Sequence, residues 1–249
     1  MPGSIRRPTQ VGENMLNNNL LALVITFASA LVWLRINDFA AHKGWVSSQV
    51  SRKIIHTGTG PIFVICWLLF TDDLNSRYLA ALVPLSITLQ FILVGLGVIQ
   101  DDAAVKAMSR SGNPREILKG PVFYGIIFVF ATLYYWLDTP TGIIALMLMC
   151  GGDGLADIAG RRWGKLKLPW SKQKSWAGSL AMLAGGWLFS TLLVFLFISA
   201  GIFPGKLGNY ILPISVIALA GAIIESLPFE DIDNFSVTFT AVLLGTFLF

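Results

Sequence analysis

Eight apolar runs, each close to the length of a membrane-spanning helix, are the feature that most limits how this chain folds. They cover residues 16–34, 56–70, 78–99, 120–137, 140–159, 178–203, 210–228 and 234–249. A helix needs about 20 apolar residues to cross the hydrocarbon core of a bilayer. Hydrophobic residues make up 55% of the chain and charged residues 13%, about half the charged share usual in soluble domains. The sequence therefore predicts an all-α polytopic membrane protein with about eight transmembrane helices and short loops.

The cations are distributed unequally between the two sides that eight spans define. Fourteen of the 18 Lys and Arg residues lie on the side of the connections 35–55, 100–119, 160–177 and 229–233. The positive-inside rule predicts that this side is cytoplasmic. A net charge of +4 on so apolar a chain indicates basic membrane loops and no nucleic-acid partner. We expect a single integral membrane domain over 1–249, with a short N-terminal tail over 1–15.

Polar residues near the spans gather in four motifs, and all four lie on the basic side. The motifs cover residues 51–60, 101–120, 151–179 and 225–234. Polar groups are costly in hydrocarbon, so their positions point to function. A small-solute or ion transporter, the non-enzyme alternative, would more often hold polar groups near mid-membrane with access from both faces. One-sided motifs favour an enzyme that meets a soluble co-substrate at one surface.

The third motif holds the richest chemistry. Asp153 and Asp157 are four residues apart and share one face of a helix, where they can hold Mg²⁺. Six cations follow over 161–174, and no Asp or Glu occurs over 158–224, so the field suits a polyphosphate. A P-loop is absent. Plainer interpretations stay open: an ion pair from Asp157 to Arg161, loop anchoring to anionic lipid, and glycines that serve helix packing.

Two other motifs add candidate groups. Arg52, Lys53 and His56 are expected at a membrane entrance, where His56 fits a general base or a phosphate ligand. The alternative is a basic turn that only faces lipid head groups. Glu225 lies within an apolar span and Asp231 follows it, which suggests metal coordination or pairing with the basic loop.

The second motif is less specific. Asp101 and Asp102 are expected to end a span, and residues 113–116 look like a turn followed by a helix start. An ordinary solvated loop is the alternative. Phosphoryl transfer fits the combined parts, because it needs positioning, Mg²⁺ and cations around the phosphates. The second substrate is then a lipid with a terminal hydroxyl, since the rest of the chain offers only bilayer-spanning surface.

Four sequence motifs occur in a recognisable order: SRKIIHTGTG, SRSGNPREILKGPVFYG, GGDGLADIAGRRWGKLKLPWSKQKSWAGS and ESLPFEDIDNFSV. Together they resemble the polyprenol kinase family of membrane proteins, and within it the phytol kinases of cyanobacteria and plastids. The resemblance covers nearly the whole chain from Ser51 onward, and the 151–179 block is its most specific part. The first 15 residues are short for a plastid transit peptide, so the resemblance points to a phototrophic bacterium and to its plasma or thylakoid membrane, with cytoplasmic catalytic loops.

The resemblance implies transfer of the γ-phosphate of CTP, with UTP or ATP as other donors, to phytol. The product, phytyl phosphate, would feed tocopherol-type prenyl lipid synthesis. The implied catalytic residues are Asp153, Asp157 and His56, and the implied Mg²⁺ ligands are Asp153, Asp157, Glu225 and Asp231. The implied nucleotide site consists of Gly152, Gly154, Gly160, Arg161, Lys165, Lys174, Gly178, Arg52 and Lys53.

Two enzyme alternatives stay open on sequence. One is a kinase of another isoprenoid alcohol, such as farnesol, geranylgeraniol or dolichol. The other is a CTP-dependent phosphatidate cytidylyltransferase, a related family with a similar Asp, Gly and basic-loop pattern. Those enzymes also carry a late His-Gly-Gly segment, whereas the last histidine of this chain is His56. The departure favours the kinase.

Overall fold

The computed structural model describes residues 19–71, 75–109, 111–228 and 233–249; the predicted tail over 1–15 lies outside them. Within these ranges the regular secondary structure is helical apart from one two-stranded hairpin. Its α-helices are α1 (Asn19–His42), α2 (Ser48–Cys66), α3 (Ser76–Gly95), α4 (Asp102–Met108), α5 (Gly120–Tyr134), α6 (Thr141–Met147), α7 (Asp153–Trp163), α8 (Trp176–Ser199), α9 (Gly208–Glu225) and α10 (Asp233–Leu248). The other elements are the 3₁₀ helices η2 (Trp67–Leu69) and η3 (Pro114–Leu118), the π-helix η4 (Leu148–Gly152), and the strands β1 (Lys167–Leu168) and β2 (Ser171–Ser175).

The expected all-α polytopic membrane fold is confirmed. Six segments of the described chain are long and apolar enough to cross a membrane, and α10 contributes a shorter apolar helix over Asn234–Leu248. The six are Asn19–Ala41, Ser76–Gly95, Pro114–Tyr134, Thr141–Trp163, Trp176–Ser199 and Gly208–Glu225. The remaining expected span corresponds to α2, which is 19 residues long but polar in its first half. All eight expected positions are therefore helical.

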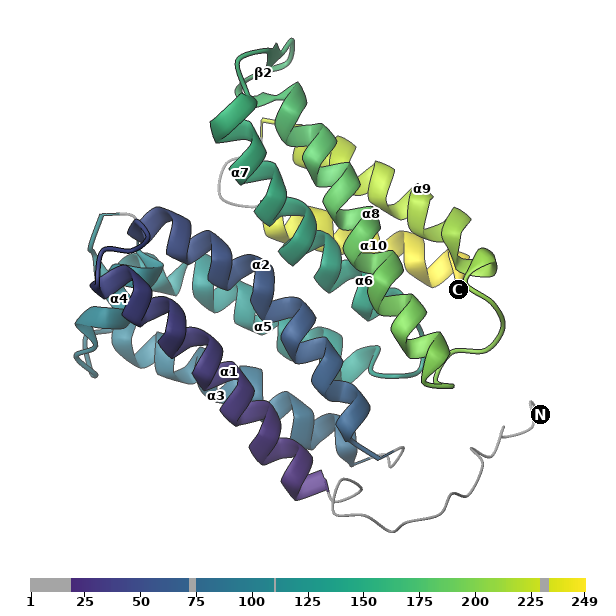
Figure 1. Ribbon diagram of the computed structural model, residues 1–249, viewed down its shortest axis with the longest axis horizontal. Helices are drawn as coiled ribbons and strands as arrows, with labels where there is room; N and C mark the ends of the chain where they lie inside the picture. The colour runs from purple at the N-terminus through teal and green to yellow at the C-terminus, as the bar shows by residue number, and fades with distance from the viewer. Residues whose placement is uncertain (1–18, 72–74, 110, 229–232) are drawn as a thin grey trace.

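The helices form two groups that lie side by side (Figure 1). In the first group α1 packs against α2 and α3, and α3 packs against α5. In the second group α8 packs against α7 and α9, and α10 packs against α9 and α6. The groups meet where α2 contacts η4 and α7.

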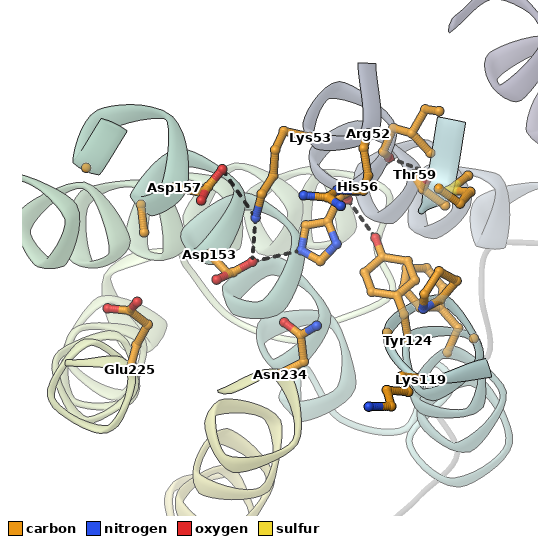
Figure 2. Close-up of a pocket in the computed structure, with 18 of the residues that line it drawn as sticks. Arg52, Lys53, His56, Thr59, Lys119, Tyr124, Asp153, Asp157, Glu225 and Asn234 are labelled. Carbon is orange, nitrogen blue, oxygen red and sulfur yellow. Dashed lines mark hydrogen bonds and ion pairs between the residues drawn. The ribbon is translucent and has the colours of Figure 1, made fainter. Parts of the chain in front are cut away.

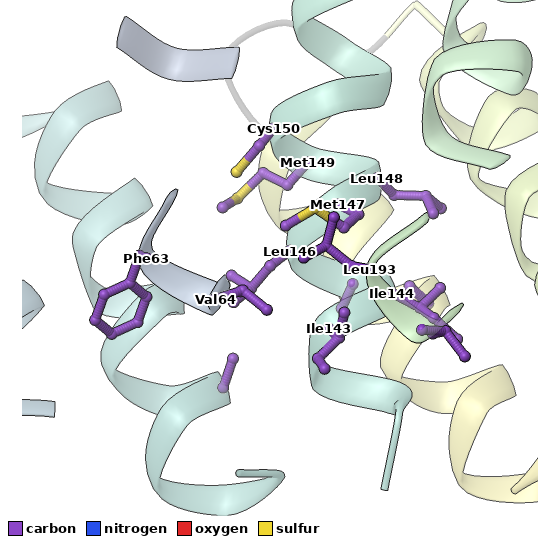
Figure 3. Packing of buried hydrophobic residues seen from close by; sticks show 14 of the residues in the cluster. Phe63, Val64, Ile143, Ile144, Leu146, Met147, Leu148, Met149, Cys150 and Leu193 are labelled. Atoms are coloured by element: carbon purple, nitrogen blue, oxygen red, sulfur yellow. The ribbon is translucent and has the colours of Figure 1, made fainter. Parts of the chain in front are cut away.

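The continuous segment formed by α6, η4 and α7 runs through the middle of the molecule. Every residue over 141–152 is buried, which explains why this stretch of sequence is apolar on all sides. Side chains of Met147, Met149 and Cys150 lie on one side of this segment (Figure 3), and a Cβ atom at Gly60 of α2 would meet Met147 and Cys150. The core of the protein is therefore centred on one fully surrounded helix.

Local capping residues explain two departures from the expected boundaries. The second span was expected to begin at residue 56, but α2 begins at Ser48 because the Ser47 hydroxyl accepts a hydrogen bond from the Val50 amide. The third span ends at Gly95, and Asp101 does not end it but caps α4 by accepting from the Ala104 amide at 2.9 Å. The first motif is consequently helical throughout.

Close helix packing at Gly60 gives a testable prediction for the fold. A Cβ atom at Gly60 would meet Cβ and Sγ of Cys150, where α2 contacts η4. We expect Gly60→Ala to lower the free energy of unfolding by about 1–3 kcal/mol, because the buried segment cannot move aside cheaply. Thermal unfolding in detergent measures the change. Gly208→Ala is the matched control, since nothing lies within 4 Å of its Cβ position; equal midpoints for the two variants would contradict the packing.

Candidate active site

A cavity of about 1170 Å³ lies where the two helix groups meet. Residues of all four polar motifs line it, as the side-chain view in Figure 2 shows for the labelled residues. The first group of helices contributes α1, α2, α3 and α5, and the second contributes α7, the hairpin and one end of each of α8, α9 and α10. The structure thus brings together motifs that are up to about 180 residues apart in sequence.

Lys53 lies between the two aspartates of the third motif. Its Nζ atom is 3.5 Å from Oδ2 of Asp153 and 3.7 Å from Oδ2 of Asp157 (Figure 2). Asp153 opens α7 and Asp157 follows one turn later, so both carboxylates face the same side. Only about a fifth of each of these three side chains is exposed. The contact joins α2 to α7 and neutralises part of the acidic charge.

His56 lies one turn after Arg52 on α2 and also contacts Asp153. Its Nε2 atom is 3.2 Å from Oδ2 of Asp153 and 2.9 Å from the carbonyl oxygen of Met149. A carbonyl oxygen only accepts hydrogen bonds, so Nε2 carries a proton and donates it. The Tyr124 hydroxyl donates to the backbone carbonyl of His56 at 2.6 Å, and the two rings lie 4.6 Å apart. The imidazole therefore has a fixed position against the first carboxylate.

A second ion pair fixes the hairpin. Lys174 Nζ donates to Oε1 of Glu225 at 2.5 Å, and the Glu225 side chain is only 6% exposed. Trp170 Nε1 donates to the backbone carbonyl of Ser226 at 3.0 Å. Both contacts connect the β1–β2 hairpin, which the sequence did not predict, to the end of α9. The hairpin is thereby held beside the cavity.

The end of the cavity that holds Lys53, Asp153 and Asp157, which we call the polar end, also contains further cations and two glycines. Arg161 donates from Nε to Oδ2 of Asp157 at 2.8 Å, which is the ion pair that the plainer interpretation of the sequence expected. Arg52 and Lys165 line the same cavity. A Cβ atom at Gly160 would lie 3.8 Å from Cα of Gly178, so the two backbones approach closely at the cavity wall. The polar end is therefore rich in positive charge, and α7 and α8 pack closely at its wall.

The structure does not bring every predicted site residue to the cavity. Gly152 and Gly154 are buried in helix contacts: Cβ atoms there would meet Met182 and Thr57 respectively. Asp231 lies outside the described residues. Glu225 is held by Lys174, and among the residues that the structure describes no group of three His, Cys, Asp or Glu side chains could hold a metal ion.

Several cavity residues were missed by the sequence reasoning. Tyr124 and Lys119 line the cavity from α5 and the turn before it, and Asn234 lines it from α10 (Figure 2). Lys119 lies at the end of the second motif and Tyr124 follows it, within the segment SRSGNPREILKGPVFYG, whose proximity to the third motif was not visible in the sequence. The second motif is therefore part of the site and more than a solvated loop.

The fold and the site define a class of protein. The chain is a multi-pass membrane protein in which a large cavity joins a basic, carboxylate-bearing end to an interior lined by Phe63, Phe91 and Phe128. Such a cavity suits one charged ligand and one apolar ligand that meet.

Comparison with known proteins identifies the family. A probable chloroplastic phytol kinase of Zea mays is 36% identical over 241 residues, covering 94% of this chain and 78% of that protein. The chloroplastic farnesol kinase of Arabidopsis thaliana is 38% identical over 239 residues, covering 95% and 78%. Phytol kinase 1 of the same plant is 33% identical over 235 residues, covering 94% and 77%. The chain belongs to the phytol and farnesol kinase family, which are phosphotransferases with an alcohol acceptor, and the resemblance to polyprenol kinases is confirmed.

Other comparisons find no counterpart. No protein-family model matches the chain, and no solved structure matches it.

The Lys53 contact gives a testable prediction for the site. Lys53→Met removes the charge that separates Asp153 from Asp157, so the two carboxylates are left to repel one another. We expect the free energy of unfolding to fall by about 1–2 kcal/mol, less than for a fully buried pair because the groups are partly exposed. Thermal unfolding in detergent without divalent cations measures this.

Two further variants make that result specific. Lys206→Met, at an exposed position away from the cavity, is expected to leave the unfolding midpoint unchanged. Adding Asp157→Asn to Lys53→Met should restore part of the loss, because one of the repelling charges is gone. A double variant less stable than Lys53→Met would contradict the electrostatic account.

Proposed function

We propose that this protein is a phytol kinase that transfers the γ-phosphate of CTP, or of UTP, to the hydroxyl of phytol. The hydroxyl oxygen attacks the γ-phosphorus, the bond to the bridging oxygen breaks, and CDP, phytyl phosphate and a proton result. The observation that carries the proposal is the large cavity in which Lys53, His56 and Asp153 lie between a cationic end and an apolar interior. Relatives named phytol kinase and farnesol kinase support the acceptor class.

The cationic end of the cavity, which is lined by Arg52, Arg161, Lys165 and Lys174, is the proposed site of the nucleoside triphosphate. Arg161 and Lys165 line it from α7 and the loop that follows, and Arg52 lines it from α2. Lys174 lines it from β2, held in position by Glu225. Arginine forks and lysine point charges are the groups that bind phosphate oxygens. The choice of CTP over UTP or ATP rests on the family resemblance alone.

Asp153 and Asp157 fit a Mg²⁺ ion. Their Oδ2 atoms both face one cation, the Lys53 ammonium group, which means that acceptor oxygens from two turns converge on one place. Mg²⁺ in nucleotide sites is commonly held by one or two carboxylates together with the phosphates. When bound, the ion would neutralise charge on the phosphate oxygens. We assign Glu225 to holding Lys174 and give Asp231 no role, because it lies outside the described residues.

His56 is proposed to orient the first carboxylate. Its Nε2 proton is shared between Asp153 and the Met149 carbonyl, so the ring restricts where the Asp153 oxygens lie. Phosphoryl transfer through a loose transition state depends mainly on positioning and charge stabilisation. Lys53 contributes a positive charge beside Asp153, where phosphate and hydroxyl would meet. The general-base role expected for His56 stays a prediction.

The product and the membrane side follow from the resemblance and the charge partition. Phytyl phosphate would feed tocopherol-type prenyl lipid synthesis. The polar end of the cavity is proposed to open to the cytoplasmic side of a bacterial plasma or thylakoid membrane, because 14 of 18 cations lie on that side of the predicted topology. The relatives compared above carry chloroplastic in their names.

A second acceptor has support of its own. The farnesol kinase relative favours a shorter isoprenoid alcohol as an alternative substrate, and geranylgeraniol and dolichol belong to the same chemical class. A phosphatidate cytidylyltransferase is disfavoured, since the relatives compared are named kinases. Product analysis separates a kinase from a cytidylyltransferase. The kinase forms CDP and a lipid monophosphate, whereas the cytidylyltransferase releases pyrophosphate and forms a CDP-lipid.

Asp153→Asn tests the proposed function at its centre. We expect transfer of label from γ-labelled CTP to phytol to fall by about 100-fold or more, because a charge that holds the metal and the phosphates is lost. Scintillation counting of the extracted lipid phosphate measures the transfer. Asp138→Asn is the matched control: Asp138 pairs with Arg77 at 2.9 Å, is 57% exposed and does not line this cavity. Activity retained in a folded Asp153→Asn protein would remove Asp153 from the site.

A further inference from the structure

The inner arm is the part of the cavity that lies among α1, α2, α3 and α5. Its floor is the part lined by Thr26, Ala30, Phe63, Val83, Ile87 and Phe128. Four of these residues, Thr26, Phe63, Val83 and Phe128, are between 1% and 4% exposed. They belong to α1, α2, α3 and α5, so one residue from each helix of the first group closes the end.

Close contacts between these four helices form the walls of the inner arm. A Cβ atom at Gly58 would meet the Trp33 ring, which brings α2 against α1. A Cβ atom at Gly125 would meet the Thr88 side chain, which brings α5 against α3. The rings of Phe63 and Phe128 lie 5.6 Å apart and connect α2 to α5. The arm is therefore a chamber between helices and not a groove on their outer surface.

The hydroxyl groups of the inner arm are already satisfied. Thr26, Thr59 and Thr88 each donate to the carbonyl oxygen four residues earlier in their own helix, at 2.7, 2.6 and 2.6 Å. A threonine bonded in this way has little to offer a polar ligand. The other residues named for the arm are hydrocarbon side chains. A nucleobase or a sugar would lose most of its hydrogen bonds to water there, because these threonines have no proton left to donate, whereas an alkyl chain would lose none.

The carboxylate and cation cluster formed by Lys53, His56 and Asp153 lies in the same cavity as the inner arm. His56, which contacts Asp153, and Phe63, which forms part of the floor, are seven residues apart on α2. Seven residues of helix span about 10 Å. An isoprenoid alcohol can therefore place its hydroxyl at the carboxylate and cation cluster while the part of its chain nearest the hydroxyl extends to the floor.

We propose that the inner arm binds the hydrocarbon chain of the alcohol substrate, with the hydroxyl at His56 and Asp153 and the chain against Phe63, Val83 and Phe128. This inference rests on the proposed function for the identity of the ligand. It adds that the acceptor is taken in between α1, α2, α3 and α5, not along the lipid-facing surface of the bundle. The floor then sets how much of the hydrocarbon chain is enclosed. The sizes of the side chains at Ala30 and Ile87 set the width of the inner arm.

Photolabelling of the wild-type full chain tests the binding site without requiring catalysis. The probe is a farnesol analogue with a diazirine on its terminal isoprene unit, applied to the protein in detergent, and mass spectrometry identifies the labelled residues. We expect label at Phe63, Val83 or Phe128. Label confined to lipid-facing residues of α3, such as Leu89, which is 50% exposed, would overturn the proposal.

A filling variant and its matched control make the test quantitative. Ile87→Trp places a large ring in the arm, and we expect the half-saturating probe concentration to rise about tenfold or more, since buried apolar contact is lost. Leu89→Trp, on the same helix but outside the cavity lining, should leave it unchanged. Ala30→Leu, from α1, should act in the same direction as Ile87→Trp and serves if that variant does not fold. Equal probe binding by the filling variants and the control would contradict binding of the probe in the inner arm.

The outcomes of the labelling and of a phosphate-transfer assay separate the two proposals. Floor labelling without any phosphate transfer would refute the kinase function and leave the inner arm as a lipid-binding chamber. Phosphate transfer to phytol or farnesol without floor labelling would leave the kinase function standing and refute the inner arm as the acceptor site.

Discussion

The contact of Lys53 with Asp153 and Asp157 is the interaction on which the rest of the site depends. Two carboxylates one helical turn apart repel one another, and a lysine from another helix offsets that repulsion. Because Lys53 belongs to α2 and the aspartates to α7, the same contact joins the two helix groups at their polar end. His56 strengthens the junction by contacting Asp153 from the next turn of α2. Charge compensation and helix packing are therefore achieved by one set of residues.

The buried segment that carries the aspartates explains why the cavity has two chemically different ends. Its first part, α6 and η4, is surrounded by apolar side chains, and its last part, α7, reaches the polar end. The change occurs at the π-helix Leu148–Gly152, an irregular turn of the kind often found at functional sites. The Met149 carbonyl within this turn meets His56. An apolar chain and a phosphate can thus approach one point from opposite sides, as a membrane lipid kinase requires.

Sequence reasoning reached the membrane fold and the importance of the third motif, because apolar run length and the spacing of Asp153 and Asp157 are local properties. It placed Lys53 near a nucleotide but not between the aspartates, since that contact joins segments about 100 residues apart in sequence. Gly152 and Gly154 were assigned to the nucleotide although they serve packing against Met182 and Thr57; a glycine in sequence does not distinguish these uses. Lys119 and Tyr124 were missed because only the fold places them around the same cavity as the aspartates of α7.

The measurement that tests the central claim most directly is a γ-labelled CTP assay on the purified protein with phytol, geranylgeraniol, farnesol and diacylglycerol as acceptors. The two-ended cavity predicts labelled lipid monophosphate from the isoprenoid alcohols, formed together with CDP in equal amount. Label appearing as pyrophosphate with a CDP-lipid, or no label in any lipid, would contradict the account.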